Sequence, residues 1–110
     1  MVTTMSESYW DGENWLDVDI DGDLIIYYLG GELHRNDGPC EIDYYDNGDI
    51  YTEIYCLNGI LNRKDGPAEI CYDGYVSKEK YYLDGRLHRD NGPAVINYYN
   101  NGKVKKKFIL

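Results

Sequence analysis

One stretch of this sequence occurs twice without a gap and a third time in shortened form. Residues 81–102 repeat residues 27–48 at a distance of 54 positions, and residues 55–70 form a third copy between them. The three prolines mark the same point in each copy, with Pro67 28 residues after Pro39 and 26 before Pro93. A period of about 20 to 50 residues is typical of architectures in which small supersecondary units stack in series. The sequence therefore predicts a repeat protein.

Turn signals stand at corresponding places in the copies. The first turn signal is Gly30-Gly31 in the first copy, Asn58-Gly59 in the second and Asp84-Gly85 in the third. These dipeptides fit type I′ hairpin turns, which need positive φ at both central residues. The second is Asp37-Gly38-Pro39, Asp65-Gly66-Pro67 or Asn91-Gly92-Pro93, and the third is Asn47-Gly48 or Asn101-Gly102, shortened to Asp73-Gly74 in the middle copy. Every copy is therefore expected to be a series of short hairpins.

The segments between the turns are rich in β-branched and aromatic residues, as in 41–45, 50–55 and 95–99. Such residues favour strands, and no segment shows a capped period of 3.6 residues. We therefore expect an all-β fold, an antiparallel meander of serial hairpins in an elongated twisted sheet. Residues 1–110 form a single repeat domain, with these expected parts: a lead-in at 1–9, an acidic hairpin or partial repeat at 10–26, and repeats at 27–54, 55–80 and 81–110.

The repeat unit resembles that of a known family. Its pattern, Tyr-Tyr-Leu-x-Gly-x-Leu-His-Arg-x-x-Gly-Pro-x, is similar to MORN-like β-hairpin repeats, especially the NGxLHRxDGPA variety of phage, giant-virus and bacterial proteins. The resemblance covers nearly everything from residue 27 onward. It implies a ladder of twisted hairpins that serves as an interaction surface without shared catalytic residues. The middle copy departs from the pattern, because Asn62 stands where the other copies have His34 and His88.

The charge is unevenly distributed along the chain. The net charge is −9, with 14 acids and one base in residues 1–55 but 6 acids and 10 bases in residues 56–110. An acidic protein is poorly suited to bind nucleic acid directly, because that binding needs Lys and Arg to displace counterions. It suits a protein partner with a basic surface.

The cysteines and the hydropathy bear on the compartment. Cys40, Cys56 and Cys71 cannot all pair, and their spacing does not suit zinc, so buried free thiols are expected. There is no basic and apolar leader and no apolar run of about 18 residues, which predicts no membrane span. We expect a soluble cytoplasmic protein, in the host cell if it is viral, that uses no metal or other cofactor.

The segment Asp17-x-Asp19-x-Asp21-Gly22-Asp23 matches the first half of an EF-hand calcium loop. The twelfth position should supply a bidentate Glu but is Tyr28, and the flanking segments are typical of strands rather than helices. An acidic hairpin explains the pattern better, which leaves only weak divalent-ion binding as an alternative.

His34-Arg35 and His88-Arg89 could in principle form a base and an anion clamp. A repeated residue in a repeat protein usually serves the repeat itself, here by hydrogen-bonding the adjacent Asp-Gly-Pro turn or by forming a salt bridge with its Asp. We therefore interpret the following residues as structural: His34, Arg35, Gly38, Pro39, Arg63, Gly66, Pro67, His88, Arg89, Gly92 and Pro93.

The acidic residues of the first half are the candidate binding site. Alternate residues of a strand lie about 6.6 Å apart, close to the phosphate spacing of a nucleic-acid strand, although a solvated strand face explains them as well. The candidate partner-binding residues are Asp17, Asp19, Asp21, Asp23, Asp43, Asp46 and Asp49.

Three hypotheses of function follow. The first is a non-enzymatic protein–protein interaction module, encoded by a virus, phage or mobile element. The second is a small acidic inhibitor that mimics nucleic acid in the basic channel of a host defence or nucleic-acid-binding enzyme. The third is a small-ligand binder that uses the His-Arg pairs. The two ends of the array also suggest a homo-oligomer through edge strands, with acidic Asp17, Asp19 and Asp21 at one edge and Lys103, Lys105 and Lys107 at the other.

Overall fold

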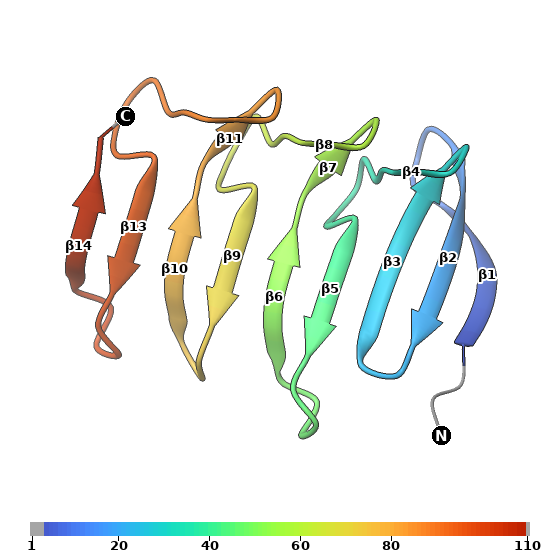
Figure 1. The fold of residues 1–110 in the computed structure, drawn as a ribbon, viewed down its shortest axis with the longest axis horizontal. Coiled ribbons are helices and arrows are strands. Elements are labelled where there is room, and N and C mark those ends of the chain that lie inside the picture. The colour runs from blue at the N-terminus through green and yellow to red at the C-terminus, as the bar shows by residue number, and fades with distance from the viewer. Residues whose placement is uncertain (1–3, 110) are drawn as a thin grey trace.

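The fold is a single antiparallel β-sheet that meanders along the chain (Figure 1). The structure is a computed structural model and describes residues 4–109, which contain strands but no helix. The strands are β1 (Thr4–Trp10), β2 (Trp15–Asp21), β3 (Leu24–Leu29), β4 (Glu32–Leu33), β5 (Glu41–Tyr44), β6 (Ile50–Ile54), β7 (Cys56–Leu57), β8 (Ile60–Leu61), β9 (Glu69–Tyr72), β10 (Val76–Lys80), β11 (Tyr82–Leu83), β12 (Arg86–Leu87), β13 (Val95–Tyr98) and β14 (Val104–Phe108).

The main sheet has the order β1-β2-β3-β5-β6-β9-β10-β13-β14, with β4 paired to β3. Two small hairpins, β7–β8 and β11–β12, stand at the upper end of the sheet beside β4 in Figure 1. The sheet does not close on itself, so β1 and β14 are its edges. The molecule measures 39 × 31 × 20 Å, a plate one sheet thick with its turns at both ends. The expected all-β antiparallel meander is confirmed.

The first turn of each copy has the expected geometry. Positive φ occurs at both central residues, with 57° and 84° at Gly30 and Gly31, 52° and 79° at Asn58 and Gly59, and 51° and 79° at Asp84 and Gly85. Asn58 and Asp84 are the residues other than glycine with positive φ in the described chain. The type I′ prediction is therefore confirmed in all three copies.

The register divides the sheet into two faces. One row of cross-strand partners runs Ile20, Ile25, Ile42, Glu53, Ile70, Glu79, Ile96 and Lys107. Cross-strand partners share a face, so this row and the buried Leu16 and Val18 define what we call the inner face. Tyr72 and Tyr98 also lie on it, and their hydroxyls donate hydrogen bonds to Glu53 and Glu79.

The alternate residues define the opposite side, which we call the open face. One of its rows runs Ser6, Asp19, Ile26, Glu41, Ile54, Glu69, Lys80, Val95 and Phe108, and a second runs Asp21, Leu24, Asp43, Thr52, Cys71, Lys78, Asn97 and Lys106. Its side chains are mostly half-buried, whereas Ile70 and Ile96 of the inner face are buried. The core therefore lies on the inner face.

The N-terminus differs from the expected lead-in. Residues 4–10 form strand β1, which pairs with the whole of β2, while residues 1–3 of that lead-in lie outside the described residues. Asp11 fixes the connecting loop, because its Oδ1 accepts from the amides of Glu13 and Asn14. Its Oδ2 accepts from the amide and the side chain of Asn36. The edge strand is therefore β1, and the prediction that Asp17, Asp19 and Asp21 form the edge is wrong.

The cysteines also differ from the expectation. Cys40 and Cys56 form a disulfide with a Cα–Cα distance of 5.5 Å, and both residues are fully buried. Cys71 alone is a free thiol. Cys40 directly precedes β5 and lies beside the end of β6, where its amide donates to the carbonyl of Ile54 at 2.8 Å, two residues before Cys56. The prediction of three free thiols is wrong for this pair.

Candidate interaction surface

Each repeat contains the same arginine–tyrosine–proline contact. Arg35, Arg63 and Arg89 lie over the rings of Tyr27, Tyr55 and Tyr81, with Cζ 4.2, 3.8 and 4.0 Å from the ring centroids. The same guanidinium groups donate from Nη1 to the carbonyls of Pro39, Pro67 and Pro93 at 3.2, 3.0 and 3.4 Å. The arginines thus hold the Asp-Gly-Pro turns against the sheet.

The glycine of each of these turns leaves room for the arginine. A Cβ at Gly38, Gly66 or Gly92 would lie 2.8, 3.0 or 2.9 Å from the guanidinium of the same repeat. Gly38 carries no positive φ that would require glycine, so the need here is for space rather than for backbone conformation. The Arg and Gly of the motif therefore depend on each other.

The residue before each arginine connects one repeat to the next. The buried His34 accepts a hydrogen bond at Nδ1 from the amide of Asn58, 3.0 Å away in the next hairpin turn. Asn62 does the same with its Oδ1, which accepts from the amide of Asp84 at 3.2 Å. Histidine and asparagine share an acceptor at this position, which explains the departure of the middle copy.

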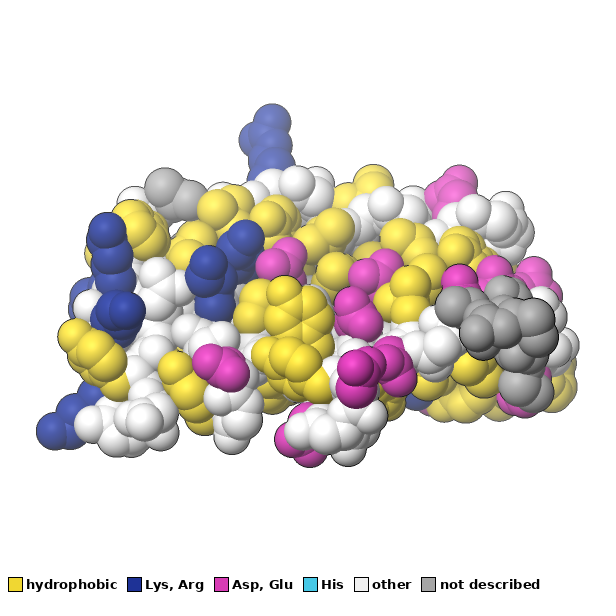
Figure 2. Space-filling view, turned by 60° about the horizontal axis from the view of Figure 1, so that its bottom comes forward, with side chains coloured by type: hydrophobic (Ala, Val, Ile, Leu, Met, Phe, Trp, Pro, Cys, Tyr) yellow, Lys and Arg dark blue, Asp and Glu magenta, His cyan; other side chains and the backbone are white. Residues whose placement is uncertain are grey.

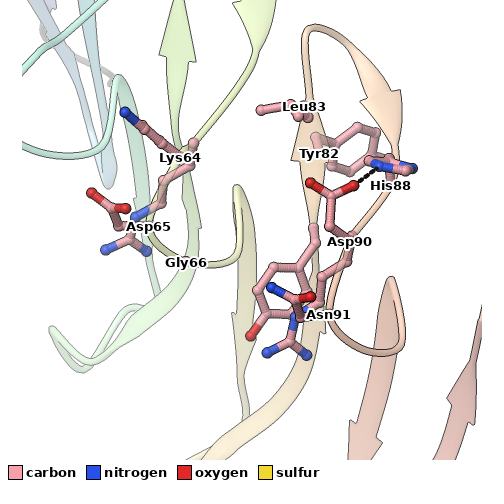
Figure 3. Close-up of a pocket in the computed structure, with 11 residues that line it drawn as sticks. Lys64, Asp65, Gly66, Tyr82, Leu83, His88, Asp90 and Asn91 are labelled. Carbon is pink, nitrogen blue, oxygen red and sulfur yellow. Dashed lines mark hydrogen bonds and ion pairs between the residues drawn. The ribbon is translucent and has the colours of Figure 1, made fainter.

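The histidine of the third repeat has a different environment. His88 is exposed, and its Nε2 lies 2.6 Å from Oδ1 of Asp90. Figure 3 shows this pair at one side of a cavity of about 340 Å³, opposite Lys64 and Asp65 of the preceding loop. The cavity is open, and Arg63 and Arg89 in its lining already contact tyrosine rings and proline carbonyls. The two His-Arg pairs therefore do not form equivalent ligand sites.

The candidate acidic residues fall into two groups. Asp17, Asp19 and Asp21 alternate along β2 and share the open face with Asp43 of β5. Asp23, Asp46 and Asp49 lie instead in the turns at the lower end of the sheet. A hydrogen bond with Asp46 is the main reason why the pKa of Asp23 is raised. The structure thus brings four of the seven candidates together on one face.

The open face also carries lysines for which the sequence predicted no part in a binding site. Lys78 and Lys80 of β10 and Lys106 of β14 lie in the same rows as the aspartates. Lys80 lies 3.6 Å from Glu69. Figure 2 shows basic side chains toward the C-terminal side of the molecule, acidic ones toward the N-terminal side, and hydrophobic ones between them. The open face is therefore polarised along the direction of the strand order.

Glu41 of β5 lies in surroundings that disfavour its charge. Partial burial, and then the charges of Asp43 and Glu69, raise the pKa of Glu41. A positive charge next to Glu41 would favour its ionised form. A basic group of a partner could therefore be accommodated at this position of the open face.

Exposed aromatic residues lie at the two ends of the same face. Trp10 and Trp15 are cross-strand partners, 50% and 68% exposed, with ring centroids 5.6 Å apart. Their parity along β1 and β2 places them with Ser8 and Asp17 on the open face. Phe108 at the end of β14 is 41% exposed and belongs to the row of Asp19.

Residues 17–28, which match half of a calcium loop, form β2, a turn and β3. Within the part of the chain that the structure describes, no cluster of His, Cys, Asp or Glu has the arrangement of a metal site. Residues 4–109 also contain no helix that could cross a membrane.

Comparisons of the chain with family models, curated proteins and solved structures find no match.

Proposed function

We propose that the protein is a non-enzymatic protein–protein interaction module of the MORN-like hairpin type. The observation that carries the proposal is the open face, a continuous sheet surface on which the apolar Ile26 and Ile54 lie among the acids and the bases of β10 and β14 lie beyond them. The arginine that recurs in each repeat unit already makes internal contacts, with the tyrosine and the proline of the same repeat. The acidic half of the open face would then meet a partner with a basic surface.

An affinity capture tests this function. Proteins retained from a cell lysate by the immobilised wild type are compared with those retained by a triple variant. This variant carries Asp17→Asn, Asp19→Asn and Asp21→Asn. The control removes the same charge from the lower turns, by Asp46→Asn, Asp49→Asn and Asp73→Asn. We expect basic proteins to be retained by the wild type and the control but not by the β2 variant. Retention that is equal in all three would contradict a role for the open face.

A second candidate is an inhibitor that imitates nucleic acid. It is favoured by the regular spacing of the aspartates on β2, about 6.6 Å between alternate residues. Lys78 and Lys80 on the same face weigh against it, because they would repel the wall of a basic channel. The test is whether the protein displaces single-stranded DNA from a captured partner, and retained DNA binding would exclude it.

We place the protein in the cytoplasm, in the host cell if the gene is viral. This rests on the repeat motif and on the composition, while the buried disulfide is unusual for that compartment.

A further inference from the structure

The charge pattern of the open face is complementary to itself. Acids occupy β2 and β5 near one end of the sheet, and Lys78, Lys80 and Lys106 occupy β10 and β14 near the other. Strand β6 lies in the middle of the order, between these two halves. A surface with opposite charges at its two ends can bind a copy of itself that is turned end to end.

We propose that the open face binds the same face of a second copy of this chain, so that two sheets form a sandwich around a two-fold axis parallel to the strands. This proposal rests on the proposed function, because it names the partner of that surface. The contact is isologous and closed, so it yields a dimer and not a filament.

The charges select this axis over the alternative. A two-fold axis parallel to the strands reverses the strand order, so that β1 covers β14, β3 covers β10 and β6 covers itself. The axis perpendicular to the strands in the same plane would place β2 over β2 and oppose Asp17, Asp19 and Asp21 to their own copies. Like charges directly opposed are unfavourable. The first arrangement opposes only Glu41 of β5 to Glu69 of β9, and Lys80 lies 3.6 Å from Glu69 and offsets its charge, so this arrangement is the more complementary one.

The lysines would face a suitable surface in this arrangement. Strand β3 carries Leu24 and Ile26 on the open face, with the aspartates of β2 on one side and Asp43 on the other. The aliphatic stems of Lys78 and Lys80 can cover the leucine and isoleucine while the ammonium groups reach the flanking carboxylates.

The two edge strands would meet as well, because β1 and β14 run in the same direction (Figure 1). Phe108 belongs to the same cross-strand row as Ser6, so the reversed strand order brings Phe108 of one copy over Ser6 of the other, four residues before Trp10. The two longer dimensions of the molecule, 39 and 31 Å, limit the face to roughly 1,200 Å², so about two thirds of it would have to be covered to reach the roughly 800 Å² per partner of a stable interface.

Sedimentation equilibrium with charge-reversed variants tests the proposal. One variant carries Asp17→Lys, Asp19→Lys and Asp21→Lys, and the other carries Lys78→Glu, Lys80→Glu and Lys106→Glu. We expect the wild type to dimerise at low salt and each variant alone to associate about 100-fold more weakly, from six reversed ion pairs. An equimolar mixture should regain the dimer, because the reversed charges of one variant face the reversed or native charges of opposite sign in the other. This recovery also shows that both variants are folded.

A third variant tests whether association depends on the open face or on the edge strand β14. Lys103→Glu, Lys105→Glu and Lys107→Glu change the same number of charges on β14 and the turn before it, and Lys107 points to the inner face. We expect this variant to dimerise like the wild type. Loss of the dimer here, a monomeric wild type at low salt, or a mixture that stays monomeric would each overturn the proposal. The proposed function would still stand if the β2 aspartates remained necessary for capturing another protein.

Discussion

At the scale of single residues, Arg63 shows what the repeated motif does. Its guanidinium stacks on Tyr55 at 3.8 Å and donates to the carbonyl of Pro67 at 3.0 Å, and it fills the space that Gly66 leaves. A planar group is needed to stack and to donate within its plane, which an ammonium cannot do equally well. The preference for arginine in the motif therefore has a physical basis in packing.

Arg63→Lys should lower the free energy of unfolding by about 1–2 kcal/mol, because the stacking and the hydrogen bond are both weakened. Arg86→Lys is the control, since Arg86 is an exposed arginine of β12. Urea unfolding of the three proteins gives the comparison. Equal midpoints for all three would show that the contact contributes nothing to stability.

Tyr98 makes stability depend on pH in the alkaline range. Burial, and then the hydrogen bond to Glu79, raise the pKa of Tyr98 to about 12 from an ordinary value of 10.0. A raised pKa means that the fold favours the neutral phenol. Its contribution is therefore complete below pH 10 and is lost as the pH rises through about 12.

Tyr98→Phe should flatten this decline between pH 10 and about 12, as measured by urea unfolding at a series of pH values. Tyr99→Phe is the matched control, because Tyr99 is the neighbouring residue and is 50% exposed. If both variants lose stability with pH as steeply as the wild type, the Tyr98–Glu79 bond is not the cause.

At the scale of elements, each hairpin is held by the repeat before it. The amide of Gly85 donates to the carbonyl of Leu61 at 2.8 Å, and the amide of Asp84 donates to the side chain of Asn62. Gly85 has φ of 79°, and a Cβ there would lie 2.9 Å from Ile60. Gly85 thus has both a turn conformation that favours glycine and a close contact with the preceding repeat.

Gly85→Val should cost at least about 1 kcal/mol of stability, because it places a β-branched residue at positive φ. The control is Gly74→Val, which has φ of 73° but open space around its Cβ. Thermal melts should show a larger loss for Gly85, and a smaller or equal loss would mean that contact with Ile60 is unimportant.

The disulfide connects two repeats across a sequence separation of 16 residues. Thiol titration should find one reactive thiol, Cys71, in the native oxidised protein and three after reduction and unfolding. Reduction should lower the free energy of unfolding by about 3 kcal/mol. Cys40→Ala should mimic reduction without disturbing the packing, because Ala68 and Ala94 occupy the same position in the other copies. Three thiols in the native protein would contradict the pairing.

The repeat period, the turn types and the alternation of Asp17, Asp19 and Asp21 were sufficient to predict the meander and one acidic strand face. Strand β1 could not be found in the same way, because Ser6, Glu7 and Ser8 show no apolar alternation and become a strand by pairing with β2.

The positions of the lysines on the open face could not be predicted from the sequence either. A register shift between Val76 and Lys78, and another between Asn97 and Tyr98, decide which lysines share a face with the aspartates. A shift of one residue moves side chains to the other side of a sheet. Likewise, Cys40 and Cys56 meet through tertiary pairing, in which the amide of Cys40 donates to Ile54 and the amide of Arg35 donates to Cys56.

At the scale of the whole molecule, the plate has the buried Leu16, Val18, Ile70 and Ile96 on its inner face and none of these on its open face. Acids lie on the N-terminal half of that open face, bases on the C-terminal half, and aromatic side chains at its ends. The central claim is that this open face is the one a protein partner covers. Cys71 lies in the middle of it, paired in register with Thr52 and Lys78.

The rate at which a thiol reagent labels Cys71 under non-reducing conditions tests this claim most directly. Burial raises the pKa of Cys71, so the labelling is measured at mildly alkaline pH, where more thiolate is present. We predict that labelling slows as the concentration of the wild-type protein rises, and that it stays constant in the variant with Asp17→Lys, Asp19→Lys and Asp21→Lys. Association that leaves the labelling rate of Cys71 unchanged would contradict the claim and place the binding surface elsewhere on the molecule.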